Sequence, residues 1–229
     1  ARAEGQLERV QNELLQIANA MRVNRVTKPH LGGNLISLGH GNFTHVISKS
    51  GNFETFGIVP ARLTTQWQNP LVLITPFTSM YLHGGWAHLV GNMLFLWVFG
   101  DNIEDSLGHV RFAVFYVLCG VAAAMAQALP DPASEIPMIG ASGAISGVLG
   151  AYLLRFPKHR VVVAVPIGFI LQMIRLPAVA VLGVWFLLQL VSSLALSSEG
   201  GGVAFRAHLG GFVAGMVLLP VFLGGKVRE

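Results

Sequence analysis

Charged side chains are scarce in this sequence: they make up 11% of its 229 residues, while 53% of the residues are hydrophobic. An ordinary soluble domain carries about 25% charged residues. A water-exposed surface cannot be built from so few charges, which excludes a soluble globular protein. The composition instead predicts a protein that exposes most of its surface to lipid.

Cysteine is almost absent as well. Cys119 is the only cysteine, and it lies inside an apolar stretch. A single thiol excludes both a disulfide framework and a cysteine metal cluster.

The chain does not concentrate its basic residues, although its net charge is +4 and its isoelectric point is near 9.6. Lys and Arg flank apolar stretches and do not form one basic stripe. Loop charge that sets membrane topology explains this distribution better than nucleic-acid binding. No nucleic-acid partner is predicted.

Long apolar stretches are abundant. A helix needs about 20 mostly apolar residues to cross the hydrocarbon core of a bilayer. A further apolar run, Val161–Ile174, has 14 residues and contains Pro166, so we expect it to lie in the membrane interface without crossing. Five regions predict membrane spans: one within Leu63–Gly100, apolar mainly from about Phe77, then Phe112–Pro130, Ile136–Leu154, Leu176–Ser198 and Ala207–Gly225.

The loops between these spans differ in basic charge, and such a bias sets orientation. One side carries only Arg206. We expect the opposite, basic side to be cytoplasmic together with the C-terminus, so the first, third and fifth spans begin at the outer face. The basic side carries seven residues: Arg111, Arg155, Lys158, Arg160, Arg175, Lys226 and Arg228.

Polar side chains gather at those outer ends. His88 and Asn92 lie near the start of the first span, Ser142 near the start of the third and His208 near the start of the fifth. The four-residue separation of His88 and Asn92 places both on one face of a helix. Because an ionisable residue inside a membrane span is a functional candidate by default, this convergence predicts a site.

Glycines surround two of these candidates. Patterns of small residues allow two helices to pack closely. We expect the third and fifth spans to pack in this way around the site, although packing alone would also explain the pattern. The glycines concerned are Gly140, Gly143, Gly147 and Gly150 around Ser142, and Gly211 and Gly215 on the helical face of His208.

The polar residues have simpler interpretations too. A serine inside a helix often bonds to its own backbone, which would account for Ser142 taken alone. His208 could be a core histidine with satisfied hydrogen bonds, and His83, nearer the water boundary, is interpreted as structural. Local bonding is the interpretation for three further serines: Ser146, Ser192 and Ser193.

Three motifs together resemble the rhomboid family of intramembrane serine proteases, whose signatures are His-x-x-x-Asn, Gly-x-Ser-Gly and Ala-His-x-x-Gly-x-x-x-Gly on three helices. The resemblance covers the chain from about Gly57 to the C-terminus. All three motifs occur in order, as His88 with Asn92, as Gly140, Ser142 and Gly143, and as Ala207, His208, Gly211 and Gly215.

The resemblance implies an all-α, polytopic membrane bundle that acts as a peptidase without an acidic third residue. Ser142 would attack the scissile carbonyl while His208 takes its proton, and helix packing would orient the histidine. The Ser142 N–H and the His88 and Asn92 side chains would form the oxyanion hole. Substrates would be transmembrane segments of other proteins in the lipid bilayer. No metal or organic cofactor is implied.

Two other functions stay open in principle. Rhomboid-like pseudoproteases bind membrane clients without catalysis, but they lack the catalytic pair, and Ser142 and His208 are both present. A transporter or channel would need a polar path through the bilayer midplane, whereas the polar groups cluster near one face. We expect a multi-pass protease of a prokaryotic plasma membrane.

Residues 1–60 depart from the resemblance. Rhomboids usually have one more membrane helix before the His-x-x-x-Asn span, and no uninterrupted apolar stretch occurs there. The segment Thr44–Phe56 alternates like a hairpin. We therefore divide the chain into an N-terminal segment, 1–60, and a rhomboid-like membrane domain, 61–229. Helical three-four spacing predicts an amphipathic helix through Leu7, Val10, Leu14, Ile17 and Met21.

Overall fold

The computed structural model describes residues 51–167, 170–195 and 203–225. The chain divides into two units, Ala1–Ser50 and Gly51–Glu229, and all the described residues belong to the second. The amphipathic helix predicted near the N-terminus lies outside the described residues, as does the first part of the predicted hairpin. The boundary predicted at residue 60 stays a prediction.

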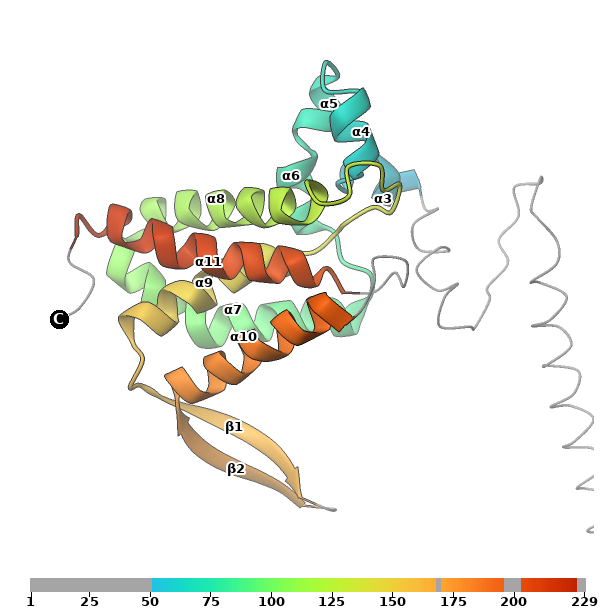
Figure 1. The fold of residues 1–229 in the computed structure, drawn as a ribbon. Helices are drawn as coiled ribbons and strands as arrows, with labels where there is room; N and C mark the ends of the chain where they lie inside the picture. The colour runs from blue at the N-terminus through green and yellow to red at the C-terminus, as the bar shows by residue number, and fades with distance from the viewer. Residues whose placement is uncertain (1–50, 168–169, 196–202, 226–229) are drawn as a thin grey trace, which may run out of the picture. The chain divides into compact units, whose positions relative to one another are not determined.

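The described unit is mostly helical (Figure 1). Short helices come first, longer helices follow, and one antiparallel hairpin is inserted between the longer helices. The order is α3 (Gly51–Phe56), α4 (Pro60–Thr65), α5 (Pro70–Leu73), α6 (Thr75–Thr78), η1 (Ser79–Tyr81), α7 (Trp86–Leu107), α8 (His109–Ala128), α9 (Ser142–Arg155), β1 (Arg160–Ile167), β2 (Ile170–Pro177), α10 (Ala178–Ala195) and α11 (Phe205–Phe222).

Prolines divide the segment before α7 into short helices. Pro60 and Pro70 are the first residues of α4 and α5, and Pro76 is the second residue of α6. Proline suits the first turn of a helix, where its missing N–H has no intrahelical partner in any case. The region Leu63–Gly100 therefore contributes a membrane-length helix only from Trp86 onward.

Backbone hydrogen bonds tie this segment to the stretch that leads into α9. Ile58 and Met138 exchange two bonds, of 3.0 and 2.7 Å, and the Ala61 N–H donates to the Ser134 carbonyl at 3.0 Å. The stretch before α9 is thus held in an extended path. It begins α9 at Ser142, so the first part of the third predicted span, from Ile136, is not helical.

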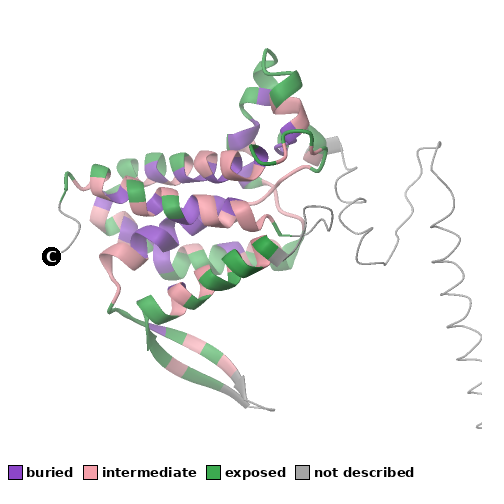
Figure 2. Cartoon of the chain, in the orientation of Figure 1, coloured by how far each residue is buried: buried purple, intermediate pink, exposed green. Residues whose placement is uncertain are grey.

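Helix α9 is the centre of the packed core. Its residues 143–152 are all buried, and it packs against α7, α8 and α11 (Figure 2). By contrast, α10 exposes large apolar side chains, among them Val184, Leu187 and Leu188. A helix that is buried on all sides needs no polar face.

Glycines allow α9 and α11 to touch through their backbones. A Cβ atom built on Gly215 would overlap the Gly147 carbonyl oxygen, and one built on Gly211 would overlap the Gly143 carbonyl oxygen. The same holds for Gly150 against the Phe212 carbonyl. Only glycine leaves room for this approach. We call the glycines at these positions the glycine seam: Gly143, Gly147 and Gly150 on α9, and Gly211 and Gly215 on α11.

A two-stranded hairpin corrects the all-α prediction. Strands β1 and β2 pair from Arg160↔Pro177 to Ile167↔Ile170, across the run that was predicted to lie in the interface without an assigned structure. The β1 sequence RVVVAVPI is rich in β-branched valine, which favours strands. A second correction concerns Gly51–Phe56, which forms helix α3 and not one arm of a hairpin.

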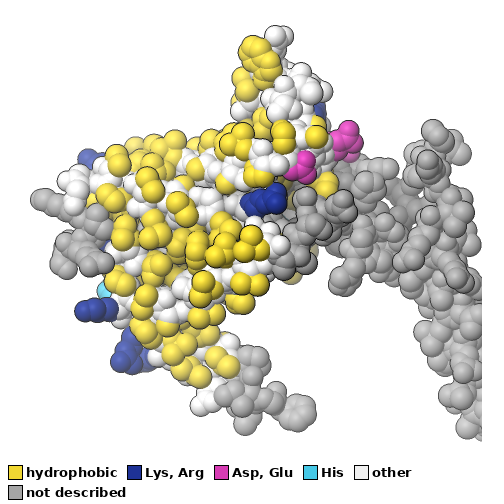
Figure 3. Space-filling model, in the orientation of Figure 1, with side chains coloured by type: hydrophobic (Ala, Val, Ile, Leu, Met, Phe, Trp, Pro, Cys, Tyr) yellow, Lys and Arg dark blue, Asp and Glu magenta, His cyan; other side chains and the backbone are white. Residues whose placement is uncertain are grey.

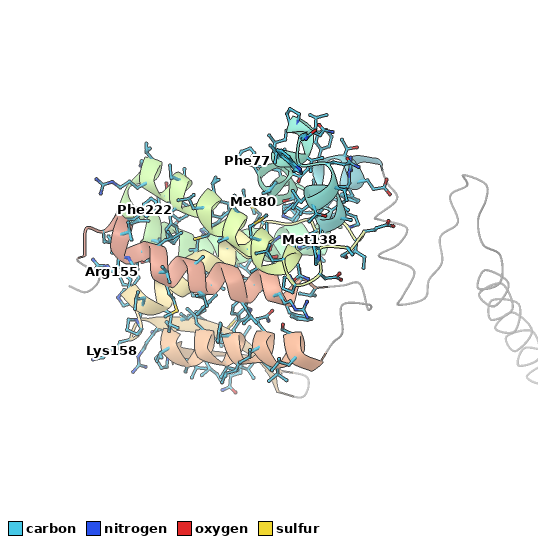
Figure 4. All side chains as sticks on the ribbon, turned by 45° about the horizontal axis from the view of Figure 1, so that its top comes forward. Phe77, Met80, Met138, Arg155, Lys158 and Phe222 are labelled. Atoms are coloured by element: carbon cyan, nitrogen blue, oxygen red, sulfur yellow. The ribbon has the colours of Figure 1, made fainter. Side chains whose placement is uncertain are left out.

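The face of the helical bundle that Figure 3 shows is largely apolar. Among the described residues, α8 and α11 are long and apolar enough to cross a membrane, and α10 contains a shorter apolar stretch, Ala178–Leu194. Figure 4 shows Arg155 and Lys158 at one end of the bundle with Phe222, and Met138 toward the other end. The loops before and after α9 therefore lie at opposite ends.

The glycine seam generates a stability prediction. Gly215→Ala should lower the midpoint of thermal unfolding in detergent, because overpacking a tight contact destabilises by about 1–3 kcal/mol. Gly183→Ala on α10 is the matched control, since a Cβ atom at that position would meet nothing within 4 Å. In an open helical position alanine is favoured over glycine by roughly 1 kcal/mol. Equal midpoints for both variants would contradict the proposed contact.

Candidate active site

The structure brings Ser142 and His208 together. Ser142 is the first residue of α9, and His208 lies in the first turn of α11. The Ser142 Oγ atom is 2.8 Å from the Nε2 atom of His208, and both side chains are half-buried. A serine hydroxyl at this distance from an imidazole nitrogen has the geometry of a nucleophile with its base.

The glycine seam sets this distance. Gly143 follows Ser142, and a Cβ built on it would meet the Ala207 Cβ atom and carbonyl oxygen at 3.9 Å. Ala207 precedes His208. Ser142 and His208 therefore each adjoin a residue through which α9 and α11 are in contact.

The N-terminus of α11 is anchored to α8. The first N–H groups of a helix have no intrahelical partner, and an unpaired one is costly in an apolar environment. The Ala207 N–H donates to the Gln127 Oε1 atom at 3.2 Å. This bond fixes the start of the helix turn that carries His208.

The second ring nitrogen of His208 also has a partner. Its Nδ1 atom is 2.7 Å from the Oε1 atom of Gln189 on α10. Sequence analysis missed Gln189, although it is an amide in an otherwise apolar part of the fourth predicted span. A polar side chain in such a span usually faces the bundle interior and has a partner there, and that rule could have identified it.

His88 lies close to the loop that precedes Ser142. A Cβ built on Gly140 would come within 2.8 Å of the His88 Cε1 and Nε2 atoms. The Gly84 N–H donates to the His88 Nδ1 atom at 3.3 Å. A neutral imidazole has one donor and one acceptor nitrogen. Since Nδ1 accepts, Nε2 carries the proton and is the donor that faces Gly140.

Asn92 offers a second donor beside Gly140. Its side chain is 7% exposed, and its buried Nδ2 atom has no hydrogen-bond partner. A Cβ on Gly140 would be 3.8 Å from that nitrogen. An unpaired buried donor costs about 1–3 kcal/mol, so its retention calls for an explanation. An acceptor that arrives with a ligand would pair it.

Gly140 adopts a backbone conformation that favours glycine, with φ at 117°. Its N–H donates to the carbonyl of Ser79, which is buried, at 2.9 Å. The bend brings the chain to Ser142 while leaving space for the His88 ring. Any side chain at Gly140 would be strained and would displace that ring.

Ser146 makes a local hydrogen bond, and His83 packs against His88. The Ser146 hydroxyl donates to the Ser142 carbonyl at 2.7 Å, which is the local bond predicted for it. The His83 ring contacts the His88 ring edge-on, with centroids 5.2 Å apart. Among the described residues, no group of three or more His, Cys, Asp or Glu side chains could hold a metal ion.

Taken together, an apolar helical bundle that brings together a serine and a histidine, with a second histidine and an asparagine beside the loop that precedes the serine, defines a class: a membrane-embedded helical protein with a polar site. One known protein family matches more than half of the chain. The Rhomboid domain family matches residues 70–225, and the chain belongs to this family. Rhomboid proteins are membrane-embedded and are typically intramembrane serine proteases.

Several relatives are similar to this chain. RHOMBOID-like protein 5 of Arabidopsis thaliana is 32% identical over 146 residues, which are 64% of this chain and 43% of that protein. Rhomboid protease GluP of Bacillus subtilis is 42% identical over 76 residues, 33% of this chain and 14% of that protein. The mitochondrial Rhomboid protein 1 of Saccharomyces cerevisiae is 28% identical over 148 residues, which are 61% of this chain and 39% of that protein. The match spans less than half the length of each of these relatives.

Proposed function

We propose that this chain is an intramembrane serine endopeptidase that cleaves transmembrane segments of other membrane proteins. The observation that carries the proposal is the 2.8 Å contact between the Ser142 Oγ and His208 Nε2 atoms. A serine hydroxyl is a weak nucleophile unless a neighbouring base takes its proton. The names of relatives such as the GluP protease support the same reaction class.

In the first half of the reaction, Ser142 Oγ attacks the scissile carbonyl carbon as its proton moves to His208 Nε2. The tetrahedral intermediate collapses, and the protonated His208 donates that proton to the leaving amine. This step leaves an acyl-enzyme on Ser142. In the second half, His208 takes a proton from water, whose oxygen attacks the ester, and then returns the proton to Ser142.

Three donors would stabilise the oxyanion. The His88 Nε2–H and the unpaired Asn92 Nδ2 atom both lie against Gly140, two residues before the nucleophile. The Ser142 N–H is at the first position of α9, where helix N–H groups lack intrahelical partners. Donors held ready for charge that develops in the transition state lower the barrier more than donors that must first reorganise.

We also propose that α7 to α11 are the five membrane-crossing helices, with the Arg155–Lys158 end cytoplasmic. Helix α9 has 14 residues, or about 21 Å at 1.5 Å per residue, against a hydrocarbon thickness of about 30 Å. With Arg155 at the inner boundary, Ser142 lies below the outer boundary. A substrate helix would have to unwind near its outer end, and the proposed location is a prokaryotic plasma membrane.

A fluorophosphonate probe tests the proposed nucleophile. The probe should label Ser142, because only an activated serine reacts at an appreciable rate. Labelling should vanish in Ser142→Ala and fall by about 10²–10⁴-fold in His208→Ala, the range contributed by a general base. Ser146→Ala is the matched control one turn away on α9, and it should label like the wild type.

One result of the probe experiment would contradict the peptidase proposal. Folded, monodisperse protein that shows neither labelling nor cleavage of a membrane-helix substrate would defeat the peptidase proposal. The chain would then be a non-catalytic member of the family that binds membrane clients.

Asn92→Ala should lower turnover without abolishing it. Loss of one oxyanion donor typically reduces kcat by about 10²–10³-fold, or roughly 2.7–4 kcal/mol of transition-state stabilisation. Asn102→Ala is the control, since it removes the same side chain from α7 ten residues later. Steady-state kinetics on one membrane-helix substrate would compare the two. Unchanged kcat in Asn92→Ala would remove Asn92 from the oxyanion role.

Cysteine labelling tests the proposed orientation. The native Cys119 is buried, so Lys158→Cys and Glu135→Cys each add one exposed thiol. In intact bacterial cells an impermeant maleimide should label Glu135→Cys, while Lys158→Cys should react only after permeabilisation. The reverse pattern would overturn the orientation.

A further inference from the structure

The two ring nitrogens of His208 have different partners. Nε2 faces the Ser142 hydroxyl at 2.8 Å, and Nδ1 faces the Gln189 Oε1 atom at 2.7 Å. A neutral imidazole carries one N–H donor and one acceptor nitrogen. The partner of one nitrogen therefore decides the role of the other.

An amide oxygen can only accept a hydrogen bond. Gln189 Oε1 thus pairs with an Nδ1–H group, and the proton of the neutral ring lies on Nδ1. Nε2 is left with a lone pair directed at the Ser142 hydroxyl. The opposite tautomer would direct an N–H at that hydroxyl, and no base would remain to take its proton.

We propose that Gln189 is the positioning residue of His208: it selects the tautomer that can act as base and holds the ring in line with Ser142. The inference rests on the proposed function of Ser142 and His208. Gln189 contacts the ring on the side away from Ser142, so it acts through His208. Orientation of the histidine therefore does not depend on helix packing alone.

Aromatic contacts hold α10 in the place that this role requires. Trp185 lies one turn before Gln189, and its ring centroid is 6.0 Å from that of His208 and 5.9 Å from that of Phe212. Phe186 contacts Phe212 as well, at 4.8 Å. Helix α10 thus supports one face of the His208 ring through Trp185 and one nitrogen through Gln189.

Two substitutions at position 189 separate an acceptor from a space-filling side chain. Gln189→Met keeps a similar length but loses the amide oxygen, whereas Gln189→Glu keeps an oxygen acceptor and loses the amide N–H₂ group. The readouts are the second-order rate of fluorophosphonate labelling and kcat and KM on a membrane-helix substrate, with the full chain in detergent micelles. Leu188→Met is the control, because Leu188 is 59% exposed on the same helix.

Gln189→Met should lower kcat and the labelling rate by about 10–100-fold with little change in KM. A loss of that size is typical when the partner that orients a metal-binding histidine is removed. Gln189→Glu should retain most of the activity, and Leu188→Met should match the wild type. A purely structural role predicts the reverse order, with Gln189→Met more active than Gln189→Glu, because a carboxylate is costly within an apolar span.

The tautomer itself can be measured in the wild-type protein. Nitrogen-15 NMR of labelled His208 should show Nδ1 protonated at neutral pH, and Gln189→Met should convert the signal to a mixture of tautomers. A ring protonated at Nε2 in the wild type would overturn the inference even if no variant folded.

The outcomes distinguish this inference from the function on which it rests. Suppose that the wild type is active. A wild-type kcat in Gln189→Met, or a kcat of Gln189→Glu below that of Gln189→Met, would then refute the role of Gln189 and leave the peptidase proposal standing. A folded wild type without labelling and without cleavage would defeat the peptidase proposal, and the inference with it.

Discussion

The backbone contact between α9 and α11 is the constraint on which the candidate site depends. Helices that meet through ordinary side chains have axes about 8–10 Å apart. Here Gly143 and Gly147 face Gly211 and Gly215 with no room for a Cβ atom. Ser142 adjoins one end of this glycine seam, and His208 lies opposite. The contact between the helices therefore also sets the 2.8 Å distance between the Ser142 Oγ and His208 Nε2 atoms. A substitution that separates the helices also separates nucleophile and base.

Each histidine of the site is assigned its role by one hydrogen bond. His88 accepts the Gly84 N–H at Nδ1, which makes its Nε2 a donor. His208 faces the Gln189 carbonyl oxygen with Nδ1, which makes its Nε2 an acceptor. The proposed reaction needs a donor beside the oxyanion and an acceptor beside the nucleophile. The same residue type meets both needs because its two partners differ, one a backbone N–H and one an amide oxygen.

Sequence analysis predicted the residues whose signal is local and missed those whose partners are distant. Helical spacing and the three motifs identified the polar residues that meet at the site, and apolar length located the long helices. Gln189 and Gln127 were missed because their partners lie 19 and 80 residues away, and only the fold brings them together. The β1–β2 hairpin was missed because apolar periodicity in a short run does not separate strand from helix. Gly140 delays the start of α9 through a φ of 117°, which composition does not reveal.

A neutral amide beside His208 suits a membrane better than the carboxylate of a water-soluble triad. An acidic residue at the centre of a membrane helix is unfavourable by roughly 2.5–3.5 kcal/mol on insertion scales, and a buried charge also requires an opposite charge to pair with it. Gln189 needs only one hydrogen bond to satisfy its oxygen, and the His208 Nδ1 atom lies at the right distance. The amide carries no charge, however, so it stabilises the imidazolium of the proposed reaction less than an aspartate would. Under the proposed reaction, more of the barrier reduction must then come from the proposed oxyanion donors, among them the Asn92 Nδ2 atom, which is buried and has no hydrogen-bond partner.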